Sequence, residues 1–335
     1  MCWGCEMGAE IDTLLLKAAA LGASDLHISA EGKAVVRING ALIRLCEMQT
    51  DIRSLLEPVL TEKQRVALRE NGECDFAYGT ASGYRFRINI YYSSGGLNAA
   101  IRVIPGSTPT CSELGLPETV GNLAELKSGL VLITGVTGSG KSTTLAAILN
   151  EINKNRAVHI LTLEDPVEYR FESVKSLIHQ REVGTDTKDF ASGLRAALRE
   201  DPDVLMVGEL RDLDSIAIAV TAAETGHLVF ATLHTRSAAE AVNRMIDVFP
   251  EQQQRQIRVQ LAGSLQAVIS QQLLPDKLGN GRIAAFETMI VTPALRNLIR
   301  EGKTQQMDSY IQTGARYGMQ TMQAAVLKLK IDGKI

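Results

Sequence analysis

The stretch GLVLITGVTGSGKST, residues 129–143, decides the fold of most of this 335-residue chain. Its first half is a short apolar run that predicts a buried strand. Its second half has the pattern G-x-x-x-x-G-K-[ST], and the helical pattern STTLAAILNEI follows directly. A glycine-rich loop between a strand and a helix is typical of a phosphate-binding P-loop, so the stretch predicts an α/β domain that binds a nucleotide.

The loop can bind phosphate mainly through its backbone. Backbone amides and the N-terminus of the following helix form an anion site, and glycine lets the backbone approach the phosphate closely. We expect Lys141 to reach the β- and γ-phosphates of ATP, and the Ser142 hydroxyl to bind Mg²⁺. The residues predicted to hold the nucleotide are Gly135, Thr137, Gly138, Ser139, Gly140, Lys141, Ser142 and Thr143.

Further short apolar runs follow the P-loop, and each precedes a helical pattern. They are VHILTLE (158–164), VLMVGE (204–209) and HLVFATLH (227–234). Continuous apolar strands that alternate with helices predict a parallel sheet covered by helices on both faces. From about residue 238 onward the pattern predicts helices, with one interruption at 275–282.

The first hundred residues have a different pattern, which predicts a smaller α+β domain on an antiparallel sheet. Helices are expected over 10–21 and about 51–70, and strands over 24–29, 34–38, 41–45, 74–79, 84–92 and 98–105. The segment 106–118 is rich in Gly, Ser, Thr and Pro, which is typical of a linker. The predicted organisation is a leader (1–8), an N-terminal domain (9–105), the linker (106–118) and an ATPase domain with C-terminal helices (119–335).

The composition excludes several classes of protein. Hydrophobic residues make up 45% and charged residues 22%, which is ordinary for a globular protein, and the net charge of −3 predicts no direct binding to nucleic acid. No apolar run is long enough to span a membrane, and the start has no pattern of a secretory signal. Five cysteines in the first third suggest a reducing cytoplasm. Cys2 and Cys5 form a CxxC pair with no second pair to complete a zinc site.

Two carboxylates follow strands of the predicted sheet at the ends where such sheets bind their ligands. Glu164 ends VHILTLE, and Glu209 ends VLMVGE. Many P-loop proteins have Asp at the end of the strand that corresponds to VLMVGE, but Gly208 occupies that place here. Magnesium would then be held mainly by Ser142 and water, and Glu209 would polarise the attacking water. The alternative is that both carboxylates are merely solvated strand ends.

Two histidines and three arginines are further candidates. His227 and His234 lie at opposite ends of one strand, so they cannot form a compact metal site by themselves. His234 is placed to contact a γ-phosphate. For His227, a structural role and a functional role are equally compatible with the sequence. Arg85, Arg87 and Arg102 lie on neighbouring strands of the first domain. They fit either a solvated face or arginine fingers that reach a phosphate.

Four motifs in order resemble the secretion ATPase superfamily, which includes type II secretion and type IV pilus motors. GVTGSGKST (135–143), LTLEDPVEY (161–169), LREDPDVLMVGELRD (198–212) and TGHLVFATLHT (225–235) resemble its Walker A motif, Asp box, Walker B motif and His box. SDLHIS, YRFRIN, AIRVIP and ALRNLIREGK (294–303) are similar to the type IV pilus retraction ATPases within it. The resemblance covers about residues 10–335. No cysteine follows Cys111, whereas extension motors usually carry a late tetracysteine motif.

The resemblance implies a homohexameric ring of subunits, each with a PAS-like N-terminal domain and a RecA-like ATPase domain. It implies that Glu209 is the catalytic base, that Glu164 lies near Mg²⁺ and its water, and that His234, with His227, senses the γ-phosphate. It also implies that Arg85, Arg87 and Arg102 close on ATP. The hairpin YYSSGGLN (91–98) lacks a basic residue that the family often has there.

The function implied is a cytoplasmic motor at the inner face of the cytoplasmic membrane. It would couple ATP hydrolysis to pilus retraction through an inner-membrane platform protein, and so act indirectly on the pilin fibre. A related secretion or DNA-uptake pseudopilus ATPase is the alternative within the family. A nucleic-acid translocase and an ATP-binding regulator that does not hydrolyse ATP are alternatives of other classes.

Overall fold

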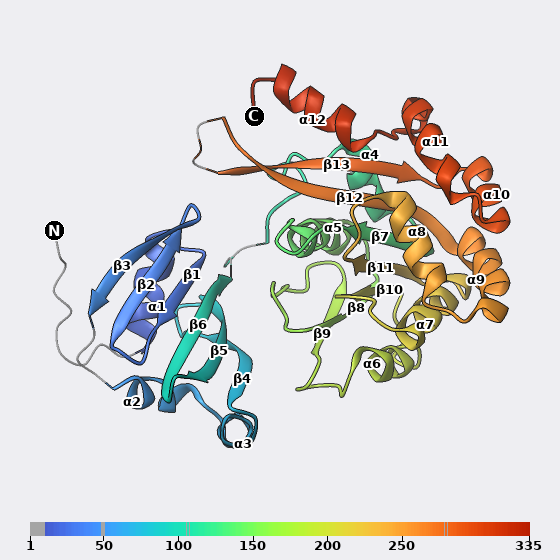
Figure 1. Cartoon of the computed structure of the whole chain (residues 1–335). Helices are drawn as coiled ribbons and strands as arrows, with labels where there is room; N and C mark the ends of the chain where they lie inside the picture. The colour runs from blue at the N-terminus through green and yellow to red at the C-terminus, as the bar shows by residue number, and fades with distance from the viewer. Residues whose placement is uncertain (1–10, 48–50, 105, 107, 278, 280) are drawn as a thin grey trace. The chain divides into compact units, whose positions relative to one another are not determined.

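The computed structural model describes residues 11–47, 51–104, 106, 108–277, 279 and 281–335. The chain divides after residue 107 into two compact units (Figure 1). The predicted leader, with Cys2 and Cys5, lies outside the described residues. Within them, every helix is too short or too polar to cross a membrane.

The first unit contains a six-stranded antiparallel sheet in the order β3-β2-β1-β6-β5-β4. Its strands are β1 (Asp25–Ile28), β2 (Lys33–Ile38), β3 (Ala41–Glu47), β4 (Glu73–Gly79), β5 (Arg85–Ser93) and β6 (Gly96–Ile104). Asn39-Gly40 and Ser94-Gly95 form the tips of two hairpins, and all four residues have positive φ. Positive φ at both central residues matches the right-handed twist of paired strands, which explains the sharp reversals.

One face of this sheet is covered by helices α1 (Ile11–Ala20) and α2 (Ile52–Leu56). Side chains alternate along β5, so Phe86, Ile88 and Ile90 are fully buried in a core shared with these helices. The helix predicted over 51–70 is interrupted by a 3₁₀ turn, η1 (Glu57–Val59), and resumes as α3 (Glu62–Asn71). Pro58 at the start of the turn explains the interruption, because proline has no N–H to continue an α-helix.

The second unit contains a seven-stranded sheet in the order β13-β12-β7-β11-β10-β8-β9. The strands are β7 (Gly129–Thr134), β8 (His159–Glu164), β9 (Leu177–Glu182), β10 (Val204–Val207), β11 (Leu228–Leu233), β12 (Leu265–Pro275) and β13 (Arg282–Ile290). All neighbouring pairs are parallel except β12 with β13. The four strands predicted from the apolar runs are present, and the α/β fold class is confirmed.

The prediction of helices alone after residue 238 is wrong, because β12 and β13 form a long antiparallel hairpin there. The segment from Leu265 is rich in Ala, Leu and Gln, which favour helices in isolation. Its place beside the central strand β7 overrides that preference, since both of its faces are then buried up to Gln271. The strand β9 was not predicted either, because it is only half-buried and carries charged residues.

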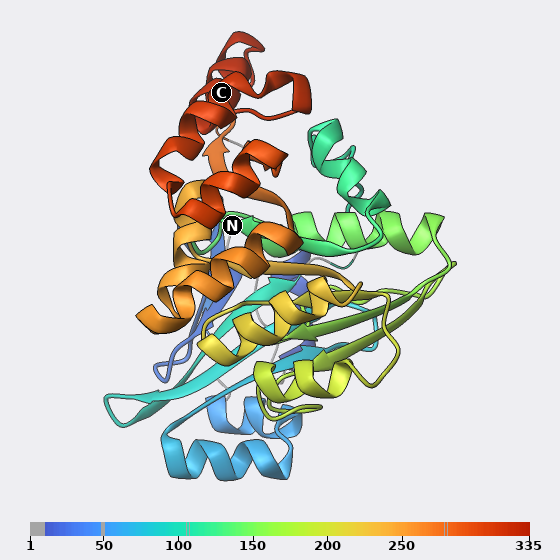
Figure 2. The same ribbon diagram turned by 90° about the vertical axis from the view of Figure 1, so that its right-hand side faces the viewer.

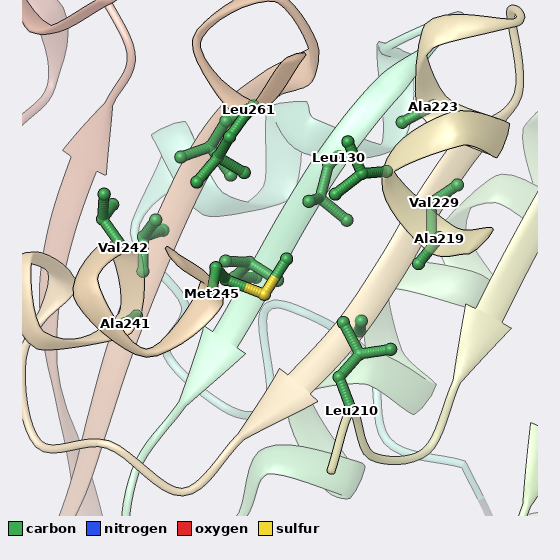
Figure 3. Packing of buried hydrophobic residues seen from close by; sticks show 14 of the residues in the cluster. Leu130, Leu210, Ala219, Ala223, Val229, Ala241, Val242, Met245 and Leu261 are labelled. Atoms are coloured by element: carbon green, nitrogen blue, oxygen red, sulfur yellow. The ribbon is translucent and has the colours of Figure 1, made fainter. Parts of the chain in front are cut away.

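Helices cover both faces of this sheet (Figures 1 and 2). Along β7, Leu130 and Leu132 pack in one core with α7, α8 and α9, and Val131 and Ile133 pack in another with α5. Figure 3 shows part of the first core. The α-helices are α4 (Glu118–Gly121), α5 (Lys141–Asn155), α6 (Phe190–Ala197), α7 (Leu213–Glu224), α8 (Ala238–Asp247), α9 (Glu251–Ser264), α10 (Pro293–Glu301), α11 (Met307–Thr313) and α12 (Met322–Ile331), and the 3₁₀ turns are η2 (Asn122–Glu125), η3 (Thr304–Gln306) and η4 (Ala315–Tyr317).

A buried carboxylate on β13 joins two helices. Glu287 accepts a hydrogen bond from the backbone N–H of Ala238, at 2.8 Å, and another from that of Met322. These are the first residues of α8 and α12. Burial raises the pKa of Glu287, and the hydrogen bonds from the two helix starts oppose that rise by favouring the charged form.

Candidate active site

The glycine-rich loop runs from the end of β7 at Thr134 to the start of α5 at Lys141. The Lys141 side chain is buried and turns back over the loop. Its Nζ donates to the carbonyl oxygens of Gly135, at 2.8 Å, and Val136, at 3.1 Å. Burial lowers the pKa of Lys141, and the negative charges of Glu209 and Glu168 oppose this. The loop therefore encloses a buried ammonium group whose two backbone carbonyl acceptors could be replaced by phosphate oxygens.

Other features of the loop fit a phosphate ligand. The Ser139 hydroxyl is buried and has no hydrogen-bond partner among the described residues. Thr137 and Gly138 are exposed at the tip, and the first turn of α5 leaves its N–H groups directed toward the loop. A buried hydroxyl without a partner is costly, so this arrangement is best satisfied by a ligand that accepts hydrogen bonds.

The side chains of the next residues on α5 differ in their exposure. The Ser142 side chain is exposed, whereas the Thr143 hydroxyl lies 3.0 Å from the hydroxyl of Tyr169. The buried Thr144 donates to Gln271 on β12. Tyr169 and Gln271 were both missed by sequence reasoning. Tyr169 belongs to the quoted Asp-box stretch, but Gln271 lies in a strand that was not predicted.

Glu164 lies at the end of β8 and is almost completely buried. Its Oε1 accepts from the Thr162 hydroxyl, at 2.6 Å, and from Gln180 Nε2, at 3.0 Å, while its Oε2 faces the Glu168 N–H at 3.3 Å. Burial raises the pKa of Glu164, and these three donors oppose the rise. The idea that it is a solvated strand end is wrong for this residue.

Gln180, on the unpredicted strand β9, is therefore a supporting residue that the sequence did not indicate. Besides Glu164, its Nε2 donates to the Tyr169 carbonyl at 2.7 Å, and its Oε1 accepts from the Phe171 N–H at 3.0 Å. It thus fixes both the carboxylate and the segment that reaches Thr143.

Glu209 follows β10 and its carboxylate lies between two side chains. Arg211 Nε is 2.7 Å from Oε2, and His234 Nε2 is 3.4 Å from Oε1. The other ring nitrogen of His234 lies 3.4 Å from the Thr137 hydroxyl at the tip of the P-loop. His234 thus lies between the P-loop and the candidate base. Arg211 was not predicted, although it is only two residues from Glu209.

The position of His234 is fixed by the neighbouring residue Thr235. The Thr134 hydroxyl at the end of β7 accepts from the Thr235 N–H at 3.0 Å and donates to its carbonyl oxygen at 2.6 Å. Both threonines are buried. This pair joins the end of β11 to the start of the P-loop and places His234 beside it.

His227 is not brought to this site. It lies before β11, at the opposite end from His234, and its Nδ1 lies 3.0 Å from the carbonyl oxygen of Ala222. A strand of six residues spans about 20 Å. The expected contact of His227 with the γ-phosphate therefore has no support within one chain. Its ring instead contacts a backbone carbonyl near the end of α7.

The three arginines of the first unit share the exposed face of the sheet. Arg87 and Arg102 are direct cross-strand neighbours, and Arg85 lies two residues from Arg87. Arg87 forms a forked ion pair with Asp75, with a shortest distance of 2.6 Å, and Arg102 Nε is 3.3 Å from Asp25. These acidic partners on β4 and β1 reduce the repulsion between the two guanidinium groups.

In the second unit, the arrangement can bind a polyphosphate and direct a water molecule. The P-loop supplies backbone donors and Lys141, and Glu209 supplies a partly exposed carboxylate that can accept a proton. Ser142 and Glu164 supply oxygen atoms, the ligands that Mg²⁺ prefers. Among the described residues there is no preformed cluster of three or more His, Cys, Asp or Glu side chains for a metal. A magnesium ion would thus depend on the nucleotide and water for most of its ligands.

A model of one protein family matches nearly the whole chain. Its description is type II/IV secretion system protein, and it matches residues 7–330. The chain is 48% identical over 329 residues to the type IV pilus retraction ATPase PilT of Pseudomonas aeruginosa, covering 97% of this chain and 95% of that protein. It is 47% identical over 304 residues to the twitching motility protein of Neisseria gonorrhoeae, covering 90% and 81%.

A solved structure agrees with these sequence matches. The crystal structure of the pilus retraction motor PilT with bound ADP superimposes with a TM-score of 0.90 at 47% identity. The alignment covers 97% of this chain and 94% of that one. The match thus extends over nearly the whole chain, including both units.

Proposed function

Because this chain belongs to the type II/IV secretion system protein family, we propose that it is a motor ATPase that retracts type IV pili. The reaction is ATP + H₂O → ADP + phosphate. The observation that carries the proposal is the contact series Thr137–His234–Glu209, which joins the phosphate loop to a candidate base at one edge of the sheet. The near full-length similarity to a pilus retraction ATPase supports the choice of process.

The residues of the second unit divide the chemical work. Lys141 exchanges the carbonyls of Gly135 and Val136 for phosphate oxygens, and its positive charge balances charge that develops on the γ-phosphate. Glu209 orients the attacking water and accepts its proton. His234 contacts both Glu209 and Thr137, so it is placed to sense whether the γ-phosphate is present. When bound, Mg²⁺ neutralises phosphate charge, and Ser142 and Glu164 are the residues that would hold it and its water.

A role in nucleotide binding is also proposed for the arginines of the first unit. Arg85, Arg87 and Arg102 lie on one face, and we propose that they close on the nucleotide in a homohexameric ring. The motor would act from the cytoplasmic side on an inner-membrane platform protein, and through it on the pilin fibre. Arg102 is the best candidate for a mobile finger, because its side chain is 63% exposed and its ion pair with Asp25 is weak.

The ring proposal is tested by ATPase rate per subunit against protein concentration, with sizing of the same samples. Wild type is compared with Arg102→Ala and with Arg44→Ala, a matched variant on the edge strand β3. Activity that rises with assembly and is lost only in Arg102→Ala would support a shared site. Equal activity of all three proteins at every assembled size would overturn it.

The cellular role requires variants that leave the core intact. Deleting α10 would remove the buried Leu295, Leu298 and Ile299, so exposed-face substitutions are preferable. Asn297→Ala with Arg300→Ala alters only exposed side chains, which contact each other at 3.1 Å. We expect normal ATPase activity and loss of twitching. Normal twitching with altered secretion or DNA uptake would instead favour the related pseudopilus role.

A further inference from the structure

Gln271 lies behind the P-loop on β12, where nothing in the proposed chemistry uses it. Strand β12 runs parallel to β7 with Ser270 opposite Thr134, so Gln271 is level with Gly135, the first residue of the loop. The side chain is only 5% exposed. A buried amide at this position has to be explained by its contacts.

These contacts reach both ends of the loop and the helix that follows. Gln271 Oε1 accepts from the Thr144 hydroxyl at 2.7 Å, in the first turn of α5. A Cβ built on Gly140 would lie 2.8 Å from Gln271 Nε2, and one built on Gly135 would clash with the Gln271 carbonyl oxygen. Both glycines therefore have the Gln271 residue directly against their backbones.

We propose that Gln271 is a positioning residue that holds the P-loop in its phosphate-binding shape. This inference rests on the proposed function, because it concerns binding of the nucleotide at that loop. The amides of the loop and of the first turn of α5 must point at one phosphate position. Gln271 restrains the start of the loop through its main chain, and the end through its side chain and Thr144. A restrained loop loses less conformational freedom on binding, which raises affinity.

The competing explanation is that Gln271 only stabilises the fold. The two explanations differ in which quantity changes. A fold contact lowers the melting temperature and leaves the affinity of the folded protein unchanged. A positioning contact weakens nucleotide binding by the folded protein at temperatures well below the melting transition.

The experiment measures the Kd of the full chain for fluorescently labelled ADP, together with Tm without nucleotide. Gln271→Met keeps the size of the side chain but removes the acceptor. Gln272→Met is the matched control, because Gln272 is the next residue and its side chain is exposed. In Gln271→Met we expect the Kd to rise about tenfold or more, as loss of a buried hydrogen bond would cause. In Gln272→Met we expect the Kd to stay within about twofold of the wild-type value.

A second pair of variants tests the same contact from the helix. Thr144→Val removes the donor at nearly constant volume, and Thr144→Ser retains the hydroxyl. We expect Thr144→Val to weaken ADP binding as Gln271→Met does, the double variant to be no worse than either single variant, and Thr144→Ser to bind nearly as wild type. This pair gives an answer even if Gln271→Met does not fold.

The outcomes separate this inference from the proposed function. If wild type binds no ADP, the proposed function fails. If wild type binds ADP and both Gln271→Met and Thr144→Val bind equally well, whatever their Tm, the positioning role is wrong. Weaker binding in the two variants with additive effects would also overturn it, because the contact would not be shared.

Discussion

Replacing Glu209 with Gln tests the catalytic assignment most directly. The substitution keeps the shape of the side chain and one oxygen, so the contacts to His234 and Arg211 can be partly retained. A general base typically contributes about 10²- to 10⁴-fold to a rate, so we expect kcat to fall by that factor. This corresponds to about 2.7–5.4 kcal/mol in the activation free energy.

The same substitution should affect stability and binding far less. The side chain of Arg211 is 65% exposed, so its ion pair with Glu209 contributes less than about 1 kcal/mol to the free energy of unfolding. Removing a negative charge near Lys141 favours binding of an anion, so the affinity for ATP should be unchanged or higher. The predicted result is a folded protein that binds ATP and does not turn it over.

The assay is phosphate release under saturating Mg²⁺-ATP, with ADP binding and urea unfolding measured on the same preparation. Arg211→Ala is the control, because it removes the ion pair but leaves the Glu209 carboxylate in place. That control should keep kcat within about tenfold of wild type. A Glu209→Gln protein whose kcat also stays within tenfold would refute the base assignment.

Three further predictions concern binding, pH and stability. Lys141→Ala should raise the Kd for ADP about 100-fold or more in equilibrium titration, since a charge-assisted contact is lost, and only a small change would contradict the phosphate role. Burial raises the pKa of Glu164, so its contribution to stability is present below its unfolded value and is lost as pH rises through the raised value. Glu164→Gln should therefore become more stable relative to wild type in urea unfolding as the pH rises above the ordinary pKa of a glutamate, and no change with pH would contradict it. Leu132→Ala should lower the free energy of unfolding by about 2–5 kcal/mol, because Leu132 is fully buried in the sheet, and a loss below about 1 kcal/mol would show that the core repacks.

The residues that sequence reasoning located best are those at strand ends next to the P-loop. Short apolar runs predicted β7, β8, β10 and β11, because these strands are buried on both faces and carry an uninterrupted apolar pattern. Parallel strands bring their carboxyl ends to one edge, so Glu164, Glu209 and His234 could be assigned to one region from their positions alone.

The supporting residues could not be predicted in the same way. Gln180 and Gln271 lie on strands whose local composition does not favour a strand, and each contacts a residue on another element, Glu164 on β8 and Thr144 on α5. Gln271 contacts Thr144, which is 127 residues away. Such contacts depend on strand order, and strand order is set by packing of the whole domain and not by a local pattern.

The carboxylate of Glu287 links the C-terminal helix α12 to the start of α8, which lies close in sequence to His234. One side chain accepts from the first N–H of both α8 and α12, while the N-cap residues Ser237 and Thr321 accept from N–H groups further along each helix. A chain that stops before Met322 would leave that acceptor with fewer donors in a buried site, and the charged form would become costlier. The hydrogen bond that would be affected is the one from the N–H of Ala238, four residues after His234. Shortening this protein at its C-terminus should thus affect the candidate active site through the charge on Glu287, without any change to the residues predicted to contact the nucleotide.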